Sequence, residues 1–145
     1  MASMTTMLAW GAISFPDGYD WAGQTEWMTK ALKWSTDYFM AAHTADTELV
    51  GQVGNGDADH AYWGRPEEMT MARPAYKITA GSPGSELAAE TAAALAASAV
   101  WYRCNGEENY AAQCLQHART LYAFADQHRG KYTDAIPNAG KVICT

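Results

Sequence analysis

The sequence predicts an all-α fold with about four helices and one long irregular loop, and three of its features indicate this. Residues 26–43 and 107–129 repeat apolar side chains at the spacing of an amphipathic helix. Residues 85–103 are apolar on all sides, which is typical of a helix in a protein interior. Residues 43–85 follow neither the helical nor the strand period and are rich in glycine and proline.

The composition indicates one folded domain, because 145 residues are too few for a second complete one. With 48% hydrophobic and 18% charged residues, the chain has enough apolar surface to fold around a core. Its net charge of -6 and pI near 5.0 offer nothing to a phosphate backbone, so no nucleic-acid partner is expected. No apolar stretch is long enough to predict a membrane span. The first ten residues show no secretory signal.

The first two predicted helices cover residues 4–13 and 26–43. The turn sequence Phe15-Pro16-Asp17-Gly18 is expected to end the first of them. The second has a wide apolar face that we expect to be buried, made by Trp27, Met28, Ala31, Leu32, Trp34, Tyr38 and Phe39. Its polar side is made by Glu26, Thr29, Lys30, Lys33, Thr36 and Asp37.

The segment 43–85 is expected to be functional. Connections longer than about 12–15 residues are uncommon inside domains, and they tend to be either functional or disordered. The aromatic side chains of Tyr62, Trp63 and Tyr76 favour function over disorder.

Residues 85–103 and 107–129 are predicted to form a helical hairpin, joined by the short turn Asn105-Gly106. The many alanines of the first helix let neighbouring helices approach closely, so we expect it to be an interior helix. Gly130 is expected to end the second helix in a left-handed conformation.

Three cysteines, Cys104, Cys114 and Cys144, are too few for a disulfide framework, and their spacing matches no metal knuckle. Only the first two are close enough in sequence to suggest a bridge. The sequence leaves open whether they pair.

The densest polar cluster lies at residues 54–67 and combines carboxylates, an imidazole, a guanidinium and an indole. A carbohydrate site needs such a mixture. The C–H face of a pyranose packs on an aromatic ring, while planar polar groups bind its hydroxyls in fixed directions. His60 and Trp63 are therefore the predicted ligand contacts.

A structural interpretation of the same cluster is open, and the residue chemistry by itself favours it. In that interpretation Asp57 and Asp59 cap turns, Arg65 pairs with Glu67, and Trp63 is a core indole.

Other chemistry finds less support in the residue pattern. Asp57, Asp59 and His60 could ligate a divalent cation, but their spacing is not that of an EF-hand loop, so no metal is predicted. Glu86 and Glu90 lie one helical turn apart, which is more typical of favourable charge at a helix N-terminus than of acid–base chemistry. No phosphate-binding loop or nucleophile elbow occurs, and no cofactor is predicted. The remaining histidines are expected to be solvated: His43, His117 and His128.

Several segments together resemble the family 9 glycoside hydrolases, the inverting cellulases of animals, plants and microbes. They include Asp57-Ala58-Asp59-His60, Trp63-Gly64-Arg65-Pro66-Glu67 and Met71-Ala72-Arg73-Pro74-Ala75-Tyr76-Lys77. Further matches lie at residues 6–11, 31–39, 52–54 and 90–96. The likeness extends over most of residues 1–139 and is greatest to the endoglucanases of insects and other invertebrates.

This resemblance implies an incomplete (α/α)6 barrel of the six-hairpin glycosidase type, with long loops that line a cleft for β-1,4-glucan such as cellulose or cello-oligosaccharides. His60 and Trp63 match family positions that contact glucosyl units, and Tyr62 and Arg65 are neighbouring candidates in the same loop. The family resemblance also implies a secreted enzyme.

The resemblance further implies that the catalytic groups are missing. Family members carry an Asp-Ala-Gly-Asp motif just before a Met-Ala pair that resembles Met1-Ala2, and their general-acid glutamate lies far downstream. Inverting hydrolysis requires both carboxyl groups, so no catalytic residue is predicted here. Residues 1–139 are thus expected to be part of a catalytic domain, and residues 140–145 to be a tail that departs from the family pattern.

Three functions are compatible with the sequence. The first is a segment of an endo-β-1,4-glucanase that holds part of the glucan cleft and by itself is inactive. The second is a non-catalytic carbohydrate-binding module, and the third is a helical interaction module whose loop cluster is structural.

Overall fold

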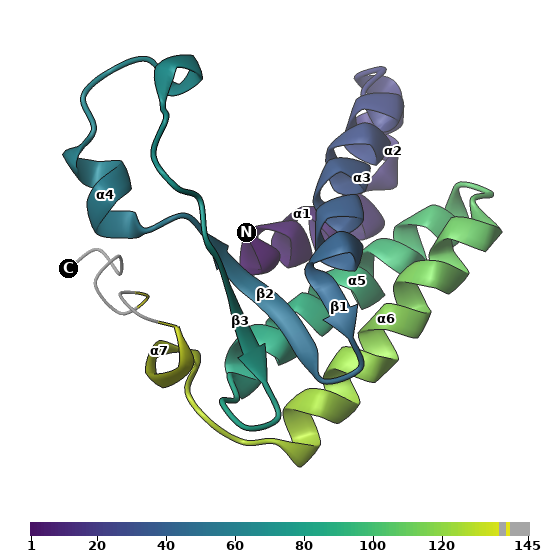
Figure 1. Cartoon of the computed structure of the whole chain (residues 1–145). Coiled ribbons are helices and arrows are strands. Elements are labelled where there is room, and N and C mark those ends of the chain that lie inside the picture. The colour runs from purple at the N-terminus through teal and green to yellow at the C-terminus, as the bar shows by residue number, and fades with distance from the viewer. Residues whose placement is uncertain (137–138, 140–145) are drawn as a thin grey trace.

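A computed structural model describes residues 1–136 and 139 of the chain, so the predicted tail at 140–145 and Cys144 lie outside the described residues. Helices dominate this part of the chain, and a small sheet accompanies them (Figure 1). The helices are α1 (Ala2–Ser14), α2 (Pro16–Trp21), α3 (Thr25–Ala42), α4 (Gly56–Ala61), α5 (Ser85–Cys104), α6 (Glu108–Gln127) and α7 (Tyr132–Ala135). A 3₁₀ helix covers Pro66–Glu68, and the strands are β1 (His43–Ala45), β2 (Glu48–Val53) and β3 (Ala75–Thr79).

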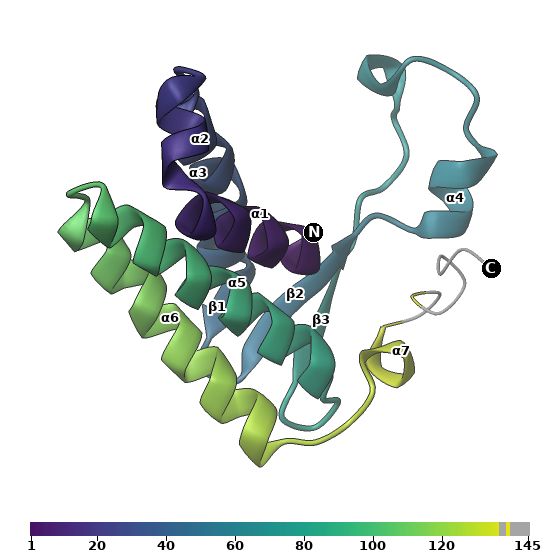
Figure 2. The same ribbon diagram turned by 180° about the vertical axis from the view of Figure 1, so that it is seen from behind.

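Helix α5 is the centre of the helical part, where it contacts α1, α3, α6 and α7 (Figure 2). The predicted hairpin of α5 and α6 is confirmed, and Gly106 makes its turn with a φ of 81°. None of the helices in the described residues is long and apolar enough to cross a membrane.

The interior position predicted for residues 85–103 is confirmed over most of the surface of α5. Ten residues of α5 are buried, among them Ala88, Ala94, Leu95 and Trp101. Alanine makes this possible because its short side chain leaves room for a neighbouring helix to lie close. One side of the hairpin is open: Ala93 is exposed, and an apolar groove of about 390 Å³ runs between α5 and α6.

The first helix ends before Phe15, as expected, but the sequence Phe15-Pro16-Asp17-Gly18 is not a simple turn, because it starts a second helix, α2. Pro16 occupies the first position of that helix. Proline suits this position because its φ angle is already helical and the amide hydrogen that it lacks has no helical partner there.

The segment 43–85 is not irregular throughout, since it contains the antiparallel sheet β1–β2–β3. Leu49 pairs with Ile78, and both side chains are buried. The register shifts between Val50 and Gln52, where a Cβ on Gly51 would lie 2.5 Å from Leu87 and Ile136. The alternation of side chains along β2 is thus interrupted at Gly51, so the sequence does not show the period of a strand there.

The wide buried face predicted for residues 26–43 was wrong in its width and direction. Trp27 and Trp34 are 63% and 81% exposed, and the buried residues of α3 are Leu32, Thr36, Phe39 and Ala42. The face that meets α1 and α5 is therefore centred on one stripe, and the tryptophans lie beside it.

Thr36 was predicted on the polar side but is fully buried, because its hydroxyl has partners in the core. The Thr36 hydroxyl donates to the Leu32 carbonyl at 3.0 Å and lies 2.8 Å from the Tyr110 hydroxyl and 3.3 Å from that of Tyr102. Tyr110 in turn donates to Asp37 at 2.5 Å. Burial raises the pKa of both tyrosines above the usual range.

The structure settles the cysteine pairing that the sequence left open, and it corrects the expected end of the second helix of the hairpin. Cys104 is exposed, Cys114 is buried, and both are free thiols. Burial raises the pKa of Cys114 to about 11, which keeps it protonated and unreactive at neutral pH. Helix α6 ends at Gln127, and Gly130 does not take the left-handed conformation; its carbonyl accepts a hydrogen bond from the Ser85 amide at 2.8 Å.

The histidines at the end of α3 and on α6 are not solvated as expected. The Nδ1 atoms of His43 and His117 lie 2.8 Å apart, and both side chains are half-buried. Burial and the neighbouring His117 lower the pKa of His43, although Asp46 opposes the shift.

Removing the Thr36 hydroxyl should destabilise the fold. Thr36→Val leaves the buried Tyr102 hydroxyl without this partner, so the free energy of unfolding should fall by about 1–3 kcal/mol in urea titrations. Thr36→Ser keeps the hydroxyl and should lose less. Equal stability of the valine variant and the wild type would contradict this role.

Stability should fall as the pH is lowered through the ordinary pKa of histidine. The lowered pKa of folded His43 means that the unfolded chain binds a proton first, near the ordinary value of 6.5. The contribution of His43 to the free energy of unfolding is thus fully present above that pH and is lost as the pH falls below it. The loss of unfolding free energy between about pH 7.5 and pH 5.5 should be smaller in His43→Phe than in the wild type, and an equal loss in the two proteins would contradict this role of His43.

Candidate functional site

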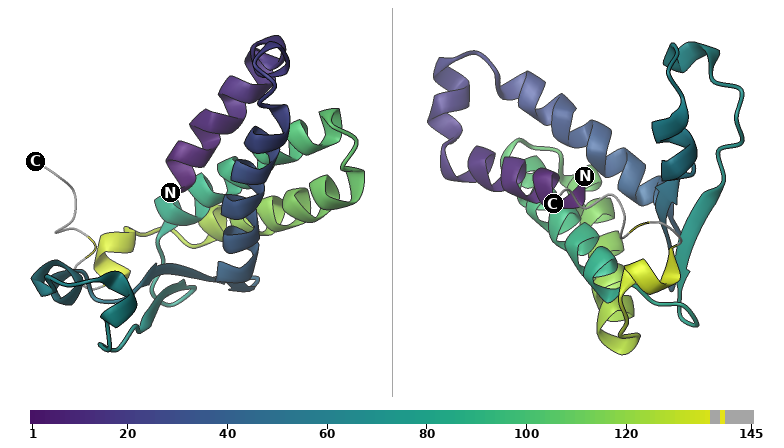
Figure 3. Two further views of the ribbon diagram at one scale, coloured as in Figure 1. Left: turned by 90° about the horizontal axis from the view of Figure 1, so that it is seen from above. Right: turned by 90° about the vertical axis from the view of Figure 1, so that its left-hand side faces the viewer.

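The polar cluster predicted at residues 54–67 lies on an arm, residues 54–74, that leaves the end of β2 and returns at β3. The arm projects away from the helices, as Figures 1 and 3 show. It contains α4 and the 3₁₀ helix. None of the residues of these two short helices is buried.

Helix α4 begins at a side-chain cap. Asn55 accepts hydrogen bonds from the backbone amides of Asp57 and Ala58 at 3.0 and 3.3 Å. Such a cap satisfies amides that have no helical partner. The N-terminal cap of α4 therefore comes from Asn55.

His60 lies at a pocket of about 360 Å³ where α4 meets the sheet. The pocket is lined by Gly51, Gln52, Val53, Gly54, Gly56, Asp59, His60, Tyr132 and Ala139. It thus combines the edge of β2, one side of α4 and part of α7. A pocket that combines apolar and polar groups can accept a hydroxylated ligand.

Trp63 and Arg65 lie on the exposed arm beyond α4 and do not line this pocket. The Trp63 side chain is 97% exposed, so the alternative of a core indole was wrong. Among the described residues, no ion pair joins Arg65 to Glu67, which corrects that alternative too.

Tyr62 shapes the arm between these residues. Its hydroxyl donates to the Arg65 carbonyl at 3.3 Å, and a Cβ on Gly64 would lie 2.6 Å from that hydroxyl. The close approach requires glycine at position 64. Tyr62 is thus placed as a support for the turn that presents Trp63.

Asp59 forms an ion pair with Arg73, a residue that the sequence did not single out as functional. Arg73 also donates to the Val53 carbonyl at 3.3 Å. No three His, Cys, Asp or Glu side chains within residues 1–136 and 139 are grouped in a way that could hold a metal ion. Asp59 is instead neutralised by a guanidinium.

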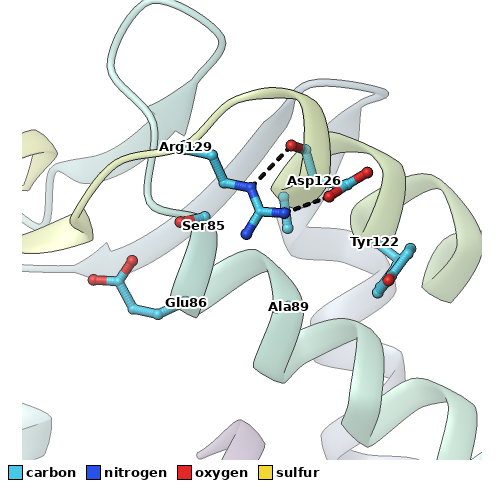
Figure 4. A pocket seen from close by; sticks show the side chains of 7 residues that line it. Ser85, Glu86, Ala89, Tyr122, Asp126 and Arg129 are labelled. Carbon is cyan, nitrogen blue, oxygen red and sulfur yellow. Dashed lines mark hydrogen bonds and ion pairs between the residues drawn. The ribbon is translucent and has the colours of Figure 1, made fainter.

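A second polar pocket, of about 320 Å³, lies at the end of the α5–α6 hairpin (Figure 4). Its charged groups bind partners within the chain. Arg129 pairs with Asp126, and Glu86 accepts a hydrogen bond from the Tyr132 amide at 2.8 Å. Glu90 accepts one from the Thr6 hydroxyl at 2.8 Å, so Glu86 and Glu90 serve packing between elements.

The family model for glycosyl hydrolase family 9 matches residues 1–143. The chain belongs to glycosyl hydrolase family 9. The sequence is 52% identical over 139 residues to endoglucanase B of Cellulomonas fimi. The aligned region covers 96% of this chain and 13% of that enzyme. It is 47% identical over the same length to an endoglucanase of Dictyostelium discoideum, covering 96% of this chain and 20% of that protein.

Solved family 9 structures share this fold. The endoglucanase of the termite Nasutitermes takasagoensis superposes on all of this chain with a TM-score of 0.96 at 55% identity, and 33% of the termite chain is covered. The cellulase Cel9M of C. cellulolyticum, solved with cellobiose, gives a TM-score of 0.85 at 40% identity, covering 90% of this chain and 30% of Cel9M. The predicted incomplete (α/α)6 barrel is therefore confirmed.

This family 9 chain spans only part of its relatives: between 13% and 26% of the length of the curated endoglucanases above and others like them. The family assignment accounts for the interior helix α5 and for the arm.

Proposed function

We propose that this chain forms part of the β-1,4-glucan cleft of a family 9 endoglucanase, with His60 and Trp63 as its principal sugar contacts. The observation that carries the proposal is a partly polar pocket at His60 together with a nearly fully exposed indole three residues further along the chain. Solved relatives bound to cellobiose and cellotetraose support this ligand class.

The two contacts have complementary chemistry. A glucosyl ring has an apolar C–H face that can stack on the indole of Trp63, and equatorial hydroxyls that an imidazole can bind. An exposed indole loses water-contacting apolar area when a sugar covers it, which favours binding. Tyr62 supports the turn that presents Trp63, and Arg65 is a neighbouring donor for hydroxyls at the edge of the site.

Catalysis in this proposal belongs to carboxylates outside these 145 residues. Inverting hydrolysis uses one carboxylic acid to protonate the leaving oxygen and a carboxylate about 6.5–9.5 Å away to activate water. Asp59, the carboxylate that lines the pocket, is held in an ion pair with Arg73. The chain then contributes binding and orientation.

The location of the whole enzyme follows from its polymeric substrate. Cellulose is too large to enter a cell, so we propose that the enzyme is exported. The alternative functions are a non-catalytic carbohydrate-binding module, which would bind glucan without any carboxylate pair, and a helical interaction module, which would bind none.

Binding of cellotetraose, measured by calorimetry, tests the sugar contacts. Trp63→Ala should weaken binding by about two- to tenfold, because stacking contributes on the order of 0.5–1.5 kcal/mol beyond area burial. Trp21→Ala is the matched control, since Trp21 is 87% exposed on the distant helix α2 and should have no effect. Equal affinities of Trp63→Ala and the wild type would remove Trp63 from the site.

Turnover tests the assignment of catalysis. The pure 145-residue chain should release no reducing sugar from carboxymethylcellulose above background. Release that disappears in Asp57→Asn or Asp59→Asn would place a catalytic carboxylate within the chain and overturn this part of the proposal.

A further inference from the structure

Arg73 lies where three segments of the arm converge. It precedes Pro74 at the return into β3, it pairs with Asp59 on α4, and its Nη2 donates to the carbonyl of Val53 at the end of β2. Its guanidinium thus bridges the beginning and the end of the arm. Both of these partners, Asp59 and Val53, line the pocket.

Gly54 makes this approach of Arg73 possible. A Cβ at position 54 would lie 2.6 Å from the Arg73 Cζ and 2.7 and 2.8 Å from its Nη2 and Nη1 atoms. The guanidinium therefore lies flat against the bare backbone of Gly54. The φ of this residue is 86°, which also favours glycine, and its amide donates to the Pro74 carbonyl at 2.8 Å.

Helix α4 depends on such ties because it has little else to hold it. It has six residues, and none of them is buried. A helix this short is unstable by itself. Its orientation is maintained at one end by the Asn55 cap and along its length by the ion pair of Asp59, the residue next to His60.

We propose that Arg73 is a positioning residue of the glucan site: by clasping Asp59, Val53 and Gly54 it fixes α4 against the sheet and holds His60 at the pocket. This inference rests on the proposed function for its ligand. Arg73 does not line the pocket, so it acts through His60 and α4.

The first test follows His60 itself in the unliganded chain. Arg73→Ala should shift the ring resonances of His60 in ¹H–¹³C NMR spectra and speed amide exchange in residues 58–61 by about fivefold, the size expected for an exposed ion pair. Exchange in α5 should be unchanged. Arg73→Lys keeps a cation for Asp59 and should restore part of the His60 signature.

Lys77→Ala is the matched control. Lys77 pairs with Glu48 between β3 and β2 at 2.9 Å, and the exposure of this pair resembles that of Arg73 with Asp59. It removes a comparable ion pair from the same sheet without touching α4. A His60 signature that moves equally in Lys77→Ala and Arg73→Ala would mean a general loss of sheet stability and would overturn the proposal.

The second test measures cellotetraose affinity. Arg73→Ala should weaken binding by about fivefold with a midpoint of thermal unfolding close to that of Lys77→Ala, and Arg73→Lys should recover part of the affinity. Gly54→Ala should mimic Arg73→Ala by displacing the guanidinium. Its effect should be smaller in the Arg73→Ala background, where only the cost of the left-handed backbone is left.

The outcomes distinguish the positioning role of Arg73 from the proposed function. If the wild type binds no cellotetraose, the proposed function fails, and the His60 resonances and α4 exchange still decide whether Arg73 positions α4. If the wild type binds and Arg73→Ala leaves affinity, His60 resonances and exchange unchanged, the positioning role is refuted while the sugar site stands.

Discussion

The close packing of α5 against its neighbours is the constraint on which the rest of the structure depends. Its alanines present little bulk on any side, so α1, α3 and α6 can all lie against it. The larger side chains Leu95 and Trp101 fill the remaining space, and Trp101 donates its indole N–H to the Thr29 hydroxyl at 3.0 Å. Helices packed this closely have few alternative arrangements.

The sheet contacts α3 through β1 and β2, and it contacts α7 through β3. A Cβ on Gly51 of β2 would lie 2.5 Å from the side chains of Leu87 of α5 and of Ile136, so α5 also approaches the sheet closely at this glycine. Leu49 and Ile78 bury their side chains beneath the strands. The 54–74 arm begins at the end of β2 and returns at β3, so its place depends on how these two strands sit on the helices.

Different forces act on the arm and on the core. The core is held by apolar burial and by a buried hydroxyl network at Thr36, whereas the arm has hardly any buried side chain and depends on a cap, an ion pair and glycines that permit close approach. Such ties are weak individually, because they are exposed to water. They do fix direction, which matters for groups that must meet a ligand at set angles.

The sequence by itself determined the helices with a strong local period, the hairpin at Gly106 and the family, because these depend on neighbours in the chain. It also brought out His60 and Trp63, since their loop is dense in polar and aromatic groups. Only the tertiary structure decided which stripe of α3 is buried, because that depends on where α5 lies. Other contacts likewise join residues far apart in the chain: the sheet, the His43–His117 contact and the ion pair of Arg73 with Asp59. A local sequence pattern cannot show which distant residues meet.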